Sequence, residues 1–158
     1  MDNFSDFKFY RVFGSTISNG KHTNIFSNGS RQPTHMPLEA HQIIDSWFEN
    51  KFGIKARSST IFVGTKRESV NKYAQYSSCV VKRISFPEDS KFIYSLSIYD
   101  LFDEIDDLQH MEGELTKESI HQFLENAEYQ ITSQPDSIPS DFLGEVMVYC
   151  HNFLLEDV

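Results

Sequence analysis

The sequence predicts an α+β fold in which helices flank a sheet of mostly antiparallel strands. Its periodic segments follow the order strand, helix, strand, helix and then mostly strands, which favours α+β over a regularly alternating parallel sheet. The 158 residues fit one domain, 1–158, and a chain of this length buries enough surface for a core without disulfides. An aromatic content of 14% also argues against disorder.

The first elements follow from a change of periodicity. Residues 7–13 (FKFYRVF) alternate apolar and polar side chains and predict a strand. Residues 14–36 show no periodicity and predict a long irregular loop, a kind of segment that often carries function. Pro37 suits the first turn of a helix, and the apolar stripe after it predicts a helix that ends at Gly53.

Shorter runs predict the remaining elements. A helix is expected to begin near Thr116, because Thr116 and Ser119 can cap it and an apolar face follows. Pro135 and Pro139 are expected to bracket a turn. A further helix is expected at residues 69–76, and strands at residues 60–63, 79–84, 91–97, 144–149 and 153–155.

The net charge of −9 is divided unevenly along the chain. Residues 1–84 carry 12 Lys and Arg against 6 Asp and Glu, whereas residues 85–158 carry 2 against 17. The two halves can pair across a shared core, or they can form a cleft with one cationic wall that suits an anionic ligand. Nucleic-acid binding is not expected, because the acidic half would repel phosphates and no Lys/Arg-rich stripe is present.

Composition also limits location and cofactors. Cys79 and Cys150 form no CxxC pair and indicate a reducing compartment, so we expect the protein to act in a cytoplasm. No run approaches 18 apolar residues, so no membrane association is expected. Residues 1–10 do not form a signal peptide, so any export would use a route that the sequence does not show. The six histidines lack metal-site spacing, and no metal is expected.

Three segments in a fixed order carry the functional signal. They are Tyr10-Arg11 on the opening strand, residues 61–66 (IFVGTK) before a helix, and residues 126–129 (NAEY) before a proline-containing loop and the strand around 144–148. Together they resemble the mono-ADP-ribosyltransferases of the cholera and pertussis toxin type. That family's pattern is an aromatic-Arg pair, a Ser-Thr-Ser turn after a strand, and an X-X-Glu signature. The resemblance implies an ADP-ribosyltransferase-like split β-sheet core with flanking helices, and NAD as a substrate.

The resemblance assigns four residues to NAD binding: Arg11, Gly64, Thr65 and Tyr73. Arg11 would contact the phosphate and ribose side, since a planar fork of donors suits a diphosphate. Thr65 would stand in the middle of the Ser-Thr-Ser turn, whose first and last serines are replaced here by Gly64 and Lys66. Tyr73 would line a nicotinamide pocket, with core packing as its alternative role.

The resemblance also implies a catalytic glutamate, which we expect to be Glu128. A carboxylate beside the ribose would stabilise the positive charge that develops as the bond to nicotinamide breaks. Glu112 and Glu114 form a rival pair, and Glu145 is a third candidate. Arginine-modifying members carry Glu or Gln two residues before the catalytic glutamate. Asn126 stands there and cannot act as a base, which favours an acceptor other than arginine.

The implied function is transfer of ADP-ribose from NAD to a macromolecule, with a protein as the expected target. A small chain of this kind suits a bacterial effector, a toxin or a phage-encoded modifier. Two alternatives stay open. The first is a binding module of the same fold that has lost catalysis and acts through its acidic face. The second is an unrelated α+β domain.

Overall fold

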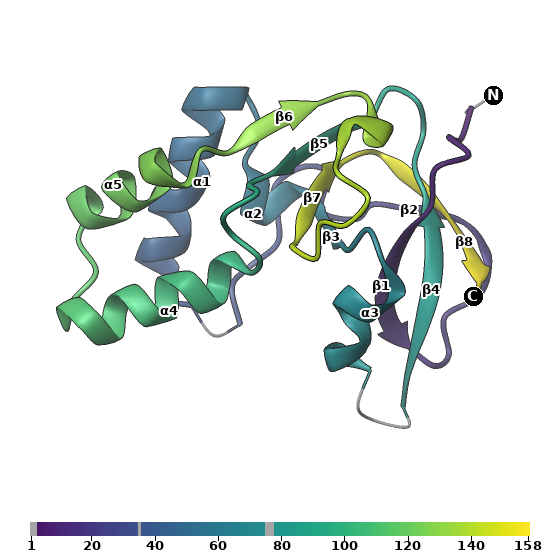
Figure 1. Ribbon diagram of the computed structural model, residues 1–158, viewed down its shortest axis with the longest axis horizontal. Helices are drawn as coiled ribbons and strands as arrows, with labels where there is room; N and C mark the ends of the chain where they lie inside the picture. Colours follow the sequence, from purple (N-terminus) through teal and green to yellow (C-terminus); the bar gives the residue numbers. More distant parts are fainter. Residues whose placement is uncertain (1–2, 35, 75–77) are drawn as a thin grey trace.

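Two four-stranded antiparallel sheets and a group of helices form the fold of residues 3–34, 36–74 and 78–158, which the computed structural model describes (Figure 1). The outer sheet has the order β1-β4-β8-β2, with strands at Phe9–Gly14, Cys79–Ser85, Asn152–Asp157 and Gly20–Thr23. The central sheet has the order β3-β7-β5-β6, with strands at Ile61–Val63, Val146–Tyr149, Lys91–Tyr94 and Gln130–Thr132. This arrangement confirms the α+β class.

The longer helices gather on one side of the molecule (Figure 1). They are α1 (Leu38–Phe52), α4 (Leu101–Glu112) and α5 (Lys117–Ala127), and the short helical elements are α2 (Ala56–Ser59), α3 (Arg67–Val70), η1 (Asn71–Tyr73) and η2 (Pro135–Ser137). As predicted, α1 follows Pro37 and ends at Gly53, whose φ of 76° suits glycine. Thr116 and Ser119 form a capping box at the start of α5. No helix within the described residues has both the length and the apolar character that a membrane span requires.

The central sheet lies between the helices and the outer sheet, so both of its faces are buried. Period-two alternation divides its side chains between two hydrophobic cores. Ile93 and Met147 pack with α1, α4 and α5, whereas Phe92 and Val148 pack with residues of the outer sheet. This burial explains why β3, β5 and β7 consist largely of apolar residues, whereas the edge strand β6 is mostly exposed.

A reciprocal bridge joins the two sheets next to Arg11. The backbone N–H of Tyr10 donates to the carbonyl of Gly64 at 2.8 Å, and the N–H of Gly64 donates to the carbonyl of Tyr10 at 2.9 Å. The end of β3 is thereby fixed against β1. The motif arginine and the turn after β3 become neighbours, although about fifty residues separate them along the chain.

Several sequence predictions need correction in detail. Residues 14–36 are not wholly irregular, because they contain β2, which pairs with β8. That strand was missed because its sequence, GKHT, lacks apolar alternation and it lies at the edge of the sheet. The strand expected at 91–97 ends at Tyr94. The helix expected at 69–76 begins earlier, as α3 and η1, and its expected end falls on residues 75–77, outside the described residues.

Candidate functional site

A pocket of about 740 Å³ opens where the two sheets meet. Its walls come from β1, from β3 and the turn after it, from α3 and η1, from the start of α4, and from the segment before β7. Figure 1 shows α3 beside β1 at this junction. The lining residues used below are Arg11, Arg57, Phe62, Gly64, Ser69, Lys72, Tyr73, Tyr99, Asp100, Leu143, Gly144 and Glu145.

Arg11 points from β1 into this pocket. Its Nη1 donates to the carbonyl of Phe62 at 2.7 Å, which fixes the guanidinium against β3. Burial lowers the pKa of Arg11, and the nearby Glu145 partly offsets this effect. The bond to Phe62 uses one of the five N–H donors of the guanidinium, so the group can also bind an anionic ligand.

Glu145 is the carboxylate that the fold brings to Arg11. Its Oε1 lies 2.7 Å from Nη1 of Arg57, and the exposed fractions of the two side chains are 17% for Glu145 and 9% for Arg57. Burial opposes the charge of Arg57, but Glu145, Tyr129 and Asp100 together outweigh it, so the pKa of Arg57 lies above its ordinary value. The guanidinium carbon of Arg57 also lies 4.2 Å from the centroid of the Phe62 ring. The ion pair with Arg57 therefore fixes the orientation of the Glu145 carboxylate, which remains partly accessible.

Hydrogen bonds hold the backbone of Glu145 and of the loop before it. The N–H of Glu145 donates to the carbonyl of Tyr99 at 2.8 Å. Thr65 Oγ1 donates to the carbonyl of Phe142 at 2.5 Å, so the turn after β3 braces the loop before the glutamate. Thr65, which the resemblance places in the middle of the Ser-Thr-Ser turn, therefore contacts the loop before Glu145 and not the segment around Glu128. A Cβ at Gly144 would collide with the Phe142 ring and lie 3.0 Å from the carbonyl of Ile98.

We therefore expect Gly144→Ala to destabilise the fold and displace Glu145. The Phe142 ring is buried and cannot swing away freely, so overpacking should cost about 1–3 kcal/mol. Chemical denaturation would measure the free energy of unfolding. Gly14→Ala is the matched control, because a Cβ at Gly14 meets nothing within 4 Å. Equal unfolding midpoints for the Gly144 variant and the parent would contradict the tight packing of this loop.

The turn after β3 has no room for a larger residue at its first position. A Cβ at Gly64 would collide with Ser69 Oγ and lie 3.0 Å from Val70 Cγ1. The Ser69 hydroxyl donates to the carbonyl of Lys66 at 2.5 Å and lines the pocket. Gly64 thus lets α3 pack directly on the strand end and places a hydroxyl at the pocket wall.

Tyr73 lines the pocket from η1. Its hydroxyl donates to Asp100 Oδ2 at 2.7 Å, and Lys72 Nζ lies 3.9 Å from the same oxygen. Burial and the hydrogen bond to Asp100 raise the pKa of Tyr73. Asp100 also caps α4 by accepting from the N–H of Asp103. With 49% of its surface exposed, Tyr73 is a pocket-lining residue and not part of the core.

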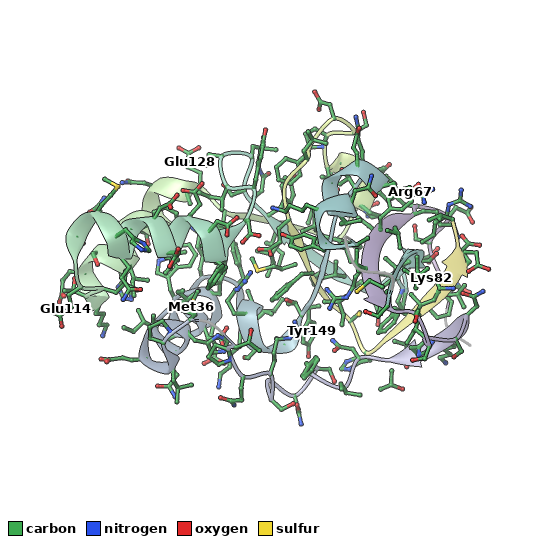
Figure 2. All side chains as sticks on the ribbon, turned by 90° about the horizontal axis from the view of Figure 1, so that it is seen from below. Met36, Arg67, Lys82, Glu114, Glu128 and Tyr149 are labelled. Atoms are coloured by element: carbon green, nitrogen blue, oxygen red, sulfur yellow. The ribbon has the colours of Figure 1, made fainter. Side chains whose placement is uncertain are left out.

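The two residues predicted to be catalytic lie outside this pocket. Glu128 is exposed at the C-terminal end of α5, where its backbone adopts a left-handed conformation with φ of 56°. Asn126 is exposed on the same helix and accepts a hydrogen bond from Gln122. Figure 2 shows Glu128 at the edge of the helical side and Glu114 at its outer end. The structure does not bring Glu112, Glu114, Asn126 or Glu128 to Arg11.

A second pocket of about 460 Å³ adjoins the first, because Arg11, Arg57, Phe62 and Phe102 line both. Its other walls include Arg31 from the loop before α1 and His41 from α1. Sequence reasoning missed Arg31, because nothing in an aperiodic loop marks it as different from a surface arginine. The only sequence feature that indicated a basic pocket was the excess of basic residues in the first half of the chain.

Among the described residues, no group of three or more His, Cys, Asp and Glu side chains is arranged to hold a metal ion. Comparisons of the chain with protein-family models, curated proteins and solved structures give no match. A function for this site has to be inferred from its own chemistry.

Proposed function

We propose that this protein is a mono-ADP-ribosyltransferase that binds NAD between Arg11 and Glu145. One observation carries the proposal: an arginine fork and a carboxylate line the same pocket, together with Gly64 and Tyr73. Three of the four residues assigned to NAD binding by the sequence resemblance therefore lie in this pocket. The fourth, Thr65, braces the loop before the carboxylate.

In this proposal Glu145 takes the catalytic role that the sequence assigned to Glu128. The bond between the ribose C1′ and the nicotinamide nitrogen breaks, and nicotinamide leaves with the electron pair. The ribose then carries developing positive charge, which a fixed carboxylate stabilises. An acceptor nucleophile bonds to C1′ and loses its proton. Arg57 would hold Glu145 in its orientation, and Arg11 would bind the diphosphate.

The position two residues before Glu145 bears on the acceptor. Leu143 stands there, is 43% exposed, and lines the pocket. An aliphatic side chain cannot act as a base, so this position favours an acceptor other than arginine, as Asn126 did for Glu128. We propose a protein as the target. The roles of toxin, effector or phage modifier and action in a cytoplasm belong to the same proposal.

The test is release of nicotinamide from NAD by the purified protein. We expect release to be stimulated little by agmatine, because no base stands at position 143. Strong modification of agmatine would contradict the assignment of the acceptor class. Binding of NAD without any release, in the presence of cell extract as a source of acceptors, would favour the alternative of a binding module.

A further inference from the structure

Three arginines from separate segments meet at Phe62, two of them against its ring and one at its backbone carbonyl. The guanidinium carbons of Arg57 and Arg31 lie 4.2 and 4.6 Å from the centroid of this ring. Arg11 donates to the carbonyl of the same residue. Arg31 is also 4.3 Å from the centroid of the Phe26 ring, so its planar group is held between two aromatic faces.

Several further contacts hold Arg31 in this place. Its Nη2 donates to the carbonyl of Thr60 at 3.0 Å. The loop that carries it is tied down by the buried Asn24, whose amide donates to the carbonyls of Ser59 and Cys150 at 3.1 and 2.9 Å. A surface arginine that only increases solubility does not require contacts that fix its position in this way.

The positive charge of the cluster is not balanced on the side of the smaller pocket. The described lining of that pocket contains Arg11, Arg31, Arg57 and His41, and no carboxylate. Glu145 pairs with Arg57 from the larger pocket. Asp45 lies behind the cluster, where it accepts from the backbone N–H of Arg57 at 2.8 Å and contacts His41.

Two further observations indicate that the described residues do not fully compensate the charge and the donors of Arg31. Its buried Nε has no hydrogen-bond partner among the described residues. Burial, together with Arg11 and Arg57, lowers the pKa of Arg31 to about 10. An anion beside the guanidinium would satisfy donors and offset the repulsion among like charges.

We infer that the smaller pocket is a phosphate subsite, in which Arg31 acts with Arg11 and Arg57 to bind the diphosphate of a nucleoside diphosphate or dinucleotide. The inference rests on the proposed function for its ligand class, but it assigns a residue and a pocket outside the sequence motifs. A diphosphate carries two negative charges and several acceptor oxygens, which matches a cluster of guanidinium forks. Because Arg11 and Arg57 line both pockets, one extended ligand can reach from Arg31 to Glu145.

The experiment is calorimetric titration of the complete chain with ADP, pyrophosphate and adenosine. We expect ADP and pyrophosphate to bind with similar affinity, adenosine to bind much more weakly, and added salt to weaken the first two. Arg31→Gln should weaken ADP and pyrophosphate binding by roughly 10–100-fold, the range for losing a hydrogen bond to a charged group. Arg31→Lys should lose less, because it keeps the charge but not the fork.

Arg83→Gln is the matched control, since it removes one positive charge from β4, outside both pockets. It should leave ADP affinity within about twofold of the parent, as expected for a partly exposed charge that lines neither pocket. Equal ADP affinity for the Arg31 variant and the parent overturns the inference. Binding of adenosine as tightly as ADP by the parent overturns it as well, and this arm does not depend on a variant that folds.

The same titrations separate this inference from the proposed function. ADP binding that requires Arg31 without any nicotinamide release supports the phosphate subsite and contradicts the transferase. Nicotinamide release that ADP does not inhibit, and that Arg31→Gln does not slow, supports the transferase and overturns the subsite.

Discussion

Glu145→Gln is expected to lower the rate of nicotinamide release by about 10²–10³-fold, the usual cost of removing one preorganised electrostatic group from an active site. Glutamine keeps the shape of the side chain but removes the negative charge that the proposal assigns to stabilising the ribose cation. NAD affinity should change far less, because the interaction is made chiefly in the transition state. Single-turnover release of labelled nicotinamide, with NAD binding measured in parallel, would check both expectations.

Loss of the charge also leaves Arg57 with a neutral hydrogen-bond partner in place of a carboxylate, so stability must be measured in the same variant. We expect the free energy of unfolding to fall by about 1–3 kcal/mol, because a hydrogen bond to a charged group is weakened in a largely buried place. Assays should therefore be run well below the unfolding temperature of the variant. Glu128→Gln and Glu114→Gln are matched controls on exposed positions and should stay within a few-fold of the parent. If the Glu128 variant lost activity while the Glu145 and Glu114 variants kept it, the catalytic residue would be Glu128.

Arg11→Ala is expected to weaken NAD binding by roughly 10–100-fold, the range for losing a charge-assisted hydrogen bond to a phosphate. The variant also loses the donor to the Phe62 carbonyl, so a stability cost of about 1 kcal/mol should accompany the loss of affinity. Fluorescence or calorimetric titration with NAD would measure the affinity. Arg83→Ala provides a control with the same change of charge on β4. Unchanged NAD affinity in the Arg11 variant would remove Arg11 as the anchor.

Local segments indicated the residues of the site that lie close to a strand or turn. The resemblance to the ADP-ribosyltransferase pattern assigned Arg11, within an alternating strand, and Gly64 and Thr65, just after an apolar run. Tyr73 followed from its place just after the same turn. These positions depend little on how distant segments pair.

The choice among the glutamates depended on strand order, which the sequence does not reveal. Glu145 precedes β7, which pairs directly with β3, and Val146 lies opposite Val63. Glu145 therefore reaches the turn at Gly64. Glu128 precedes β6, which lies at the far edge of the central sheet, with β5 and β7 between it and β3. Both glutamates stand before a short strand, so local sequence could not separate them.

The division of charge left a cationic wall as one of two possibilities and did not indicate which residues would form it. Arg11, Arg31 and Arg57 all come from the basic first half, and Glu145 comes from the acidic second half. The arginines stand in a strand, a loop and a four-residue helix, so no single periodicity relates them. Only the tertiary packing around Phe62 brings them together.

The close fit of Gly64 against Ser69 has a consequence for how the turn can change. A serine introduced at position 64 would collide with the Ser69 hydroxyl, so it should strain this junction unless the Ser69 side chain moves or is shortened. The side chains at these two positions are therefore coupled. Combining Gly64→Ser with Ser69→Gly would remove that collision and keep one hydroxyl at the pocket wall, while moving its attachment from α3 to the strand end.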